Sequence, residues 1–427
     1  MTARKLIALV LALISFAVVG CSGTGSSTKE PASSSAKSSE PVTLRMMIWD
    51  KNQQPALETI AKEFQKTHSN ITVNVEVTPW DQYWTKLQTA ATGNTLPDVF
   101  WMNAMNFPLY AANKQLMSYA DRVKADGVDM SKYPKDLVET YSYNGQVYGL
   151  PKDFDTIGLW YNKQLFDAAK LPYPDDTWDW AKLREVAKKL TDTSKGIWGI
   201  AAELGDQTSI WNTIYQNGGY VLSPDKATSG YDKPETVAGI QFWVDLIKDG
   251  SSPTLAQMTD TAPAQLFESG KVAMYFAGSW MVREFKENEY TKDKVNVTVL
   301  PKGKKRAVMI HGLGNVTAAK TKHPNEAWEF VKYLGGKEAA EIQAKTGTVI
   351  PAYTGTQDMW VQSAPQFNLK VFLDMAQYGV ALPATMNSEK WRTAHVTYFT
   401  KAWAGEITVE EAAKNVAKAM NEVLAKK

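Results

Sequence analysis

Residues 141–166, YSYNGQVYGLPKDFDTIGLWYNKQLF, predict the place where the chain passes from one folded half to another. Asn144 and Gly145 both tolerate positive φ, so this pair between two aromatic, β-prone runs predicts a two-residue hairpin turn. Pro151 fixes its own φ and holds the preceding residue extended, which excludes a helix or a central strand. Residues 152–155 are charged and aromatic. An extended connection of this kind between two halves favours a ligand cleft; a surface hairpin that leads into a strand is the alternative.

The first twenty residues predict an export signal. Arg4 and Lys5 form a short positive region, and the apolar run that follows at residues 6–19 is too short for a membrane span. Residues 18–21, VVGC, resemble the bacterial lipoprotein box, in which the cysteine is lipidated and becomes the first mature residue. Cys21 is the only cysteine, so no internal disulfide is possible, and a lipid anchor explains its presence. A cleaved signal with a chance cysteine is the alternative.

The charge balance excludes a nucleic-acid-binding protein. The chain has 47 Lys and Arg against 45 Asp and Glu, and residues 1–20 hold two of the basic residues and none of the acidic ones. The mature chain is therefore neutral and lacks the basic excess that phosphate backbones require. Its 15 Trp and 18 Tyr exceed the needs of a core, which indicates a binding surface, and the length allows two or more domains.

Helical and strand patterns alternate after a polar linker. Residues 21–41 are nearly all small or polar and predict a disordered tether. Apolar strand patterns at 44–49, 73–77 and 99–102, separated by amphipathic helices, predict an α/β fold with a parallel sheet. The alternation resumes after the crossing, where Thr177 is the expected N-cap of the next helix.

Seven segments lie along most of the chain: TLRMMIWD (43–50), LPDVFWMN (96–103), YGLPKDFDTIGLWYNKQLF (148–166), DTWDWAKL (176–183), FESGKVAMYFAGSW (267–280), TKHPNEAWEFVKYL (321–334) and AGEITVEEAAKNV (404–416). In this order, and behind the predicted lipoprotein signal, they resemble the extracellular solute-binding proteins of ABC sugar importers, the group that includes maltose-binding protein.

The resemblance implies a two-lobed, periplasmic-binding-protein-like α/β fold with a ligand cleft between the lobes, which close on the ligand by hinge motion. We expect residues 42–152 and 308–350 in lobe one, residues 153–307 and 351–427 in lobe two, and a second crossing near 307–310. The resemblance also implies a monomer, anchored at the extracellular face of the bacterial cytoplasmic membrane, that delivers a carbohydrate to the membrane subunits of an ABC importer.

A sugar site needs aromatic planes for the apolar ring faces and planar hydrogen-bonding groups for the hydroxyls. By family position, we expect aromatic platforms at Trp211, Trp280 and Trp391, whereas Trp101 lies in an apolar strand and is expected in the core. The full set of expected ligand-binding residues is Trp49, Asp50, Asn103, Asp153, Asp155, Glu203, Asp206, Trp211, Asn212, Trp280, Trp391 and Arg392.

Few features of the sequence indicate catalysis, so no enzymatic activity, metal or cofactor is expected. The histidines lie far apart without an HExxH motif or a Cys partner: His68, His311, His323 and His395. No GxSxG or Walker-type loop is present. Asp153 and Asp155 could imitate a glycosidase pair. A secreted carbohydrate-active enzyme, a binder of a non-sugar solute and a structural lipoprotein without a small ligand remain the alternatives.

Overall fold

The first lobe is organised around β1 (Val42–Ile48), which pairs in parallel with β2 (Ile71–Val77) and β3 (Val99–Met102). The computed structural model describes residues 40–426. Two later segments extend the sheet in the order β2-β1-β3-β13-β6: β13 (Gly314–Thr317) pairs antiparallel with β3, and β6 (Gly149–Pro151) pairs antiparallel with β13. The predicted parallel strands are confirmed, and the sheet as a whole is mixed.

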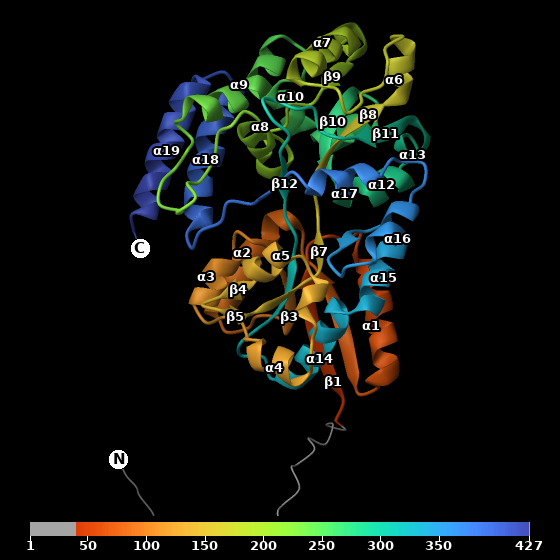
Figure 1. Cartoon of the computed structure of the whole chain (residues 1–427), viewed down its shortest axis with the longest axis vertical. Helices are drawn as coiled ribbons and strands as arrows, with labels where there is room; N and C mark the ends of the chain where they lie inside the picture. Colours follow the sequence, from red (N-terminus) through yellow and green to blue (C-terminus); the bar gives the residue numbers. More distant parts are fainter. Residues whose placement is uncertain (1–39, 427) are drawn as a thin grey trace, which may run out of the picture. The chain divides into compact units, whose positions relative to one another are not determined.

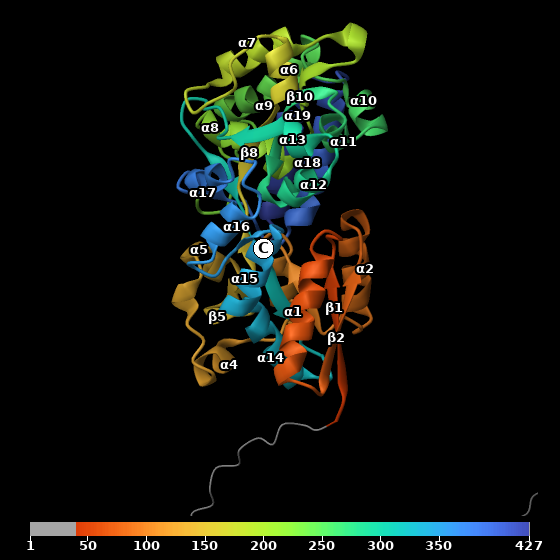
Figure 2. The same cartoon turned by 90° about the vertical axis from the view of Figure 1, so that its right-hand side faces the viewer.

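Helix α1 (Gln54–Thr67) covers one face of this sheet, as Figure 2 shows. Pro55 lies in its first turn, where a missing N–H costs no hydrogen bond, and the predicted apolar face is buried through Leu57, Ile60 and Phe64. The other helices of this lobe are α2 (Trp80–Thr92), α3 (Phe107–Ala112), α4 (Ala120–Ala125), the 3₁₀ turn η1 (Met130–Lys132), α5 (Lys135–Thr140), α14 (Pro324–Gly335) and α15 (Lys337–Thr346).

The predicted hairpin forms ahead of the first crossing. Strands β4 (Ser142–Tyr143) and β5 (Gln146–Val147) pair antiparallel around Asn144 and Gly145. These two residues have φ of 50° and 76°, the left-handed conformation that a type I′ turn requires at both central positions.

The second lobe contains a separate sheet in the order β11-β8-β10-β9 (Figure 1). β8 (Ile157–Asn162) is buried along its whole length and pairs antiparallel with β10 (Val272–Gly278) and β11 (Val295–Thr298). β9 (Trp198–Ile200) adds in parallel to β10. A strand that is buried on both faces appears in the sequence as a continuous apolar run, which is why β8 and β10 were predictable.

Helices surround this second sheet, and the C-terminal pair α18 and α19 packs against α9, far away in sequence (Figure 1). The N-cap of α7 (Trp180–Leu190) is Asp179, whose side chain accepts a hydrogen bond from the Lys182 amide at 2.8 Å. Thr177 was predicted to be this N-cap, but its hydroxyl donates a hydrogen bond to Asp175, so that prediction is wrong. The helices are α6 (Lys163–Ala168), α7 (Trp180–Leu190), η2 (Thr193–Lys195), the π turn η3 (Asp206–Ile210), α8 (Trp211–Gln216), α9 (Pro234–Lys248), α10 (Leu255–Asp260), α11 (Pro263–Glu268), η4 (Ser279–Met281), α12 (Val282–Glu287), α13 (Thr291–Lys294), α16 (Gln357–Gln362), α17 (Lys370–Ala376), α18 (Ser388–Trp403) and α19 (Val409–Leu424).

Short strand pairs accompany the passages between the lobes (Figure 1). β7 (Asp153–Phe154) pairs with β14 (Ile350–Pro351), and β12 (Val308–Ile310) pairs with β15 (Gly379–Ala381). Residues 308–310 were expected in lobe one, but β12 is bound to second-lobe elements. The expected second crossing near residues 307–310 and the expected lobe boundaries stay predictions.

Within residues 40–426, no helix combines the length and apolar character needed to cross a membrane. The expected signal peptide, Cys21 and nearly all of the tether lie outside the described residues.

Candidate functional site

A cleft of about 570 Å³ is lined by residues of both lobes and of the crossings. First-lobe residues Trp49, Asp50 and Asn103 follow the carboxyl ends of β1 and β3, the usual position of ligands in open α/β sheets. The other predicted residues at the cleft are Asp153, Asp155, Glu203, Asp206, Trp211, Trp280 and Arg392. Of the twelve predicted positions, only Asn212 and Trp391 are absent from this lining.

Trp49 is the centre of an aromatic cluster at the first-lobe edge of the cleft. Its ring lies edge-on to Tyr83 and Trp101, with ring centroids 4.9 and 5.0 Å away. Trp101 is fully buried, as the sequence predicted. Edge-to-face pairs of this kind fix ring orientation, so Trp49 presents a firmly held indole to the cleft.

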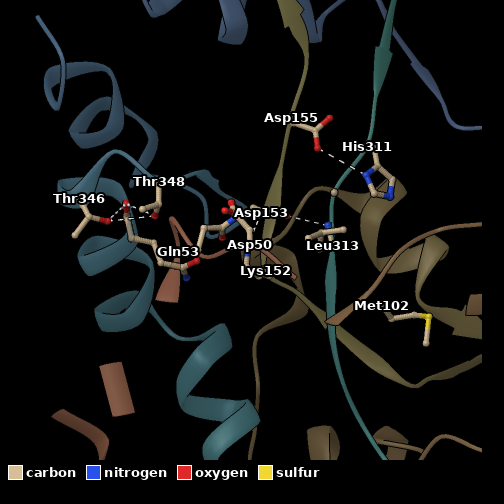
Figure 3. Close-up of polar contacts among 12 residues, drawn as sticks. Asp50, Gln53, Met102, Lys152, Asp153, Asp155, His311, Leu313, Thr346 and Thr348 are labelled. Carbon is tan, nitrogen blue, oxygen red and sulfur yellow. Dashed lines mark hydrogen bonds and ion pairs between the residues drawn. The ribbon is translucent and has the colours of Figure 1, made fainter. Parts of the chain in front are cut away.

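Asp153 ties the first crossing to the second (Figure 3). Its carboxylate forms a buried ion pair with Lys152 and accepts a hydrogen bond from the Leu313 amide at 2.8 Å. The Lys152 ammonium also lies 4.5 Å from the ring centroid of Trp101. Both charges are therefore compensated, and the Asp153 carboxylate links the two crossings through its hydrogen bond with the Leu313 amide.

Asp155 faces His311 across the crossings (Figure 3), and its Oδ2 lies 3.7 Å from His311 Nδ1. His311 Nε2 accepts from the Ala104 amide at 3.2 Å, so the neutral ring carries its proton on Nδ1, toward Asp155. Gln207, from the second lobe, donates to the other carboxylate oxygen. Burial raises the pKa of Asp155, although His311 and Gln207 favour its charged form.

Asp206 and Arg392 form the charged pair on the second-lobe side of the cleft. Arg392 Nε lies 2.6 Å from Asp206 Oδ2, and His395 Nε2 lies 2.6 Å from Oδ1. Two acceptor atoms would repel at that distance, so His395 Nε2 carries a proton. Burial opposes ionisation of Asp206, but His395 and Arg392 outweigh it and lower the pKa of this carboxyl. Asp206 is thus an anion that orients the Arg392 guanidinium at the cleft.

Glu203 lies on a side of the cleft where the carboxylates have neutral partners. It accepts hydrogen bonds from Thr208 and Tyr275 at 3.2 and 3.1 Å, and burial raises its pKa. Glu284 also lines the cleft and is the carboxylate neighbour of Glu268. This side of the cleft therefore offers hydrogen-bond acceptors rather than fixed ion pairs.

Trp391 and Asn212 were expected to bind the ligand, but the structure places both outside the cleft lining. Trp391 is fully buried, its ring centroid is 6.4 Å from that of Trp211, and its Nε1 donates to Thr385. Asn212 is also buried; its amide donates to two backbone carbonyls of η3 and accepts from the Met309 amide at 2.8 Å. Trp391 is a core residue here and Asn212 joins α8 to β12.

Several cleft residues were not predicted, among them Trp80, Gln207, Tyr275 and Glu284. A signal for Trp80 was available, because Trp80 comes shortly after the end of β2, as Trp49 comes after the end of β1. Within residues 40–426, no three His, Cys, Asp or Glu side chains are grouped to hold a metal ion. The arrangement provides stacking surfaces and hydrogen-bond partners, which is the chemistry of reversible binding.

Comparisons with known proteins place the chain in a family. A sequence profile of the family described as "Bacterial extracellular solute-binding protein" matches residues 50–341. The Maltodextrin-binding protein of Bacillus subtilis is 23% identical over 97% of this chain and 96% of its own length. The Maltooligosaccharide ABC transporter solute-binding lipoprotein of Streptococcus pneumoniae is 26% identical over 80% of this chain and 78% of its own.

A solved structure shares the fold closely. An ABC substrate-binding protein of Listeria monocytogenes in complex with cycloalternan superposes with a TM-score of 0.85 and 26% identity. The match covers 91% of this chain and all of that one.

We predict that Glu268→Gln stabilises the protein at alkaline pH. Burial and the neighbouring Glu284 raise the pKa of Glu268 to about 7, from an ordinary value of 4.5. The folded state therefore holds this proton more tightly, so the stabilisation is fully present below about pH 4.5 and is lost as the pH rises through 7. The variant should melt higher than the wild type at pH 8 and at nearly the same temperature at pH 4 in scanning calorimetry.

Glu410→Gln is the matched control, because Glu410 is exposed and its carboxylate pairs with Lys414 at 2.7 Å. This control should not gain stability at pH 8. Parallel melting profiles for Glu268→Gln and the wild type across this pH range would contradict the prediction.

Proposed function

The chain belongs to the bacterial extracellular solute-binding protein family, and from that premise we propose that it binds an oligosaccharide in its cleft and delivers it to an ABC importer. The observation that carries this proposal is the lining of the cleft, where Trp49 and Trp280 stand among carboxylates and Arg392. Relatives named for maltodextrin, maltooligosaccharide and cycloalternan binding support the same class of ligand. We also propose that the protein is a monomer.

The electrostatics favour binding over glycoside hydrolysis. A glycosidase needs one carboxylic acid to protonate the leaving group and one free carboxylate as base or nucleophile. Asp153 is neutralised by Lys152 and fixed by the Leu313 amide, so it is free for neither role. Asp155, in contrast, keeps hydrogen-bonding capacity toward the cleft, which suits a sugar hydroxyl.

Removing cleft groups should weaken binding without unfolding the protein. Trp280 is half-buried at the cleft, and loss of a stacked ring in Trp280→Ala should cost roughly 1–3 kcal/mol. Asp155→Asn should cost about 1.5–3 kcal/mol if the carboxylate accepts ligand hydroxyls. The ligand is found by thermal-shift screening of mono- and oligosaccharides, and the variants are titrated calorimetrically.

Tyr173→Ala is the control, since Tyr173 is an exposed ring that does not line the cleft. If both cleft variants, Trp280→Ala and Asp155→Asn, bind like the wild type, the site assignment fails. If the wild type binds no saccharide in the screen, the proposed function fails.

Ligand binding should draw the lobes together. The crossings are short extended segments, and a few such residues suffice to absorb a hinge motion between rigid lobes. We expect a smaller radius of gyration by small-angle scattering at saturating ligand than without ligand. An unchanged radius would contradict closure, and a concentration series in the same experiment checks the monomeric state.

Cys21 should anchor the protein to the membrane. The VVGC box and the polar segment after it motivate this assignment. Because a single acyl chain gives only marginal binding, we expect at least two chains on the mature N-terminus. In the native host, Cys21→Ser should move the protein from the membrane fraction to the soluble or secreted fraction. Retention of the variant in the membrane fraction would overturn the assignment, with Ser22→Ala as the control.

A further inference from the structure

Trp80 differs from every other residue that lines the cleft. It is 45% exposed, whereas each of the other lining residues is buried or half-buried. A large aromatic side chain that is exposed at a cleft leaves apolar surface that the face of a ligand ring can cover. The roles proposed for Trp280 and Asp155 do not involve this exposed ring.

The backbone that carries Trp80 is firmly held. The Thr78 amide donates to the Ile48 carbonyl at 2.9 Å, which ties this segment to the end of β1 next to Trp49. Pro79 then fixes the backbone ahead of α2, and Trp80 is the first residue of that helix. The indole therefore projects from a rigid connection at the sheet edge.

Two neighbouring tryptophans orient the ring itself. Trp49 lies edge-on to Trp80 with centroids 5.2 Å apart and planes at 73°. Trp84, one helical turn further along α2, lies 5.7 Å away at 89°. Because these contacts are edge-to-face, Trp80 is positioned without being covered. A pre-oriented and solvent-accessible indole is suited to stacking, since little conformational entropy is lost when a ligand binds.

We infer that Trp80 forms an outer stacking subsite, which binds a sugar ring of a long oligosaccharide beyond the rings held in the enclosed part of the cleft. This inference rests on the proposed function and makes it more specific. A mono- or disaccharide enclosed among the buried lining groups does not need to reach Trp80. A longer chain extends to the cleft entrance, where the apolar face of another ring covers the exposed indole. Trp80 therefore sets a preference for chain length.

The test compares affinities for short and long ligands. Wild type, Trp80→Ala and Trp80→Phe are titrated calorimetrically with malto-, isomalto- and galacto-oligosaccharides from the disaccharide to the tetrasaccharide. For the series that binds, Trp80→Ala should weaken the tetrasaccharide about tenfold and leave the disaccharide unchanged. Trp80→Phe, which keeps a ring, should recover most of the loss. Trp80→Gln is measured alongside as a second variant without a ring, and Tyr173→Ala is the matched control, with 39% exposure away from the cleft.

The possible outcomes separate the inference from the function. An equal loss for both ligand lengths, or no loss for either, overturns the outer subsite while the proposed function stands. No recovery in Trp80→Phe, with normal melting, also overturns it. A wild-type protein that binds none of the three series removes the proposed function, and the inference with it.

Discussion

Lys152 and Asp153 are adjacent in the chain and both are buried at the first crossing, where each compensates the charge of the other. Taking two charges out of water is costly, and it is tolerated only where the remaining hydrogen-bonding capacity is also satisfied. Here the Leu313 amide and the Trp101 ring satisfy it. The pair therefore links the second crossing, through the Leu313 amide, to the first-lobe core, through the Trp101 ring. Asp153 and Leu313 both line the cleft.

The carboxylates of the cleft fall into two groups as a consequence. Asp153 and Asp206 have cationic partners, so their geometry is fixed before any ligand arrives. Asp155 and Glu203 are held by neutral donors or by a neutral histidine, and burial raises the pKa of each. Fixed ion pairs shape the cleft, whereas the second group keeps the acceptor capacity that a polyhydroxylated ligand requires.

The sequence predicted the fold well because the buried strands β1, β3, β8 and β10 are strong local signals and their order matches a known family. It also predicted most cleft residues, since these follow strand ends or lie in the crossing. The site prediction failed where the direction of a side chain on a helix decides whether that side chain reaches the cleft. Trp391 and Arg392 are neighbours on α18, yet the spacing of Trp391, His395 and Phe399 places Trp391 on the buried face, while Arg392 turns to the cleft. That periodicity was present in the sequence, but the expectation that Trp391 binds the ligand rested on its position in the family.

Direct polar contacts between the lobes away from the crossings are few in the described residues, and this limits what can hold the lobes together. Asn106 donates to Glu389 at 3.2 Å, and Arg283 donates to the Asn52 carbonyl. Partly exposed contacts of this kind contribute roughly 0.2–1 kcal/mol each, because water competes for the same groups. A ligand that touches first-lobe and second-lobe groups at once makes its full set of contacts only when both lobes are near. In the proposed function, the ligand's differential affinity for the closed state would therefore decide how far the lobes close, rather than these few hydrogen bonds.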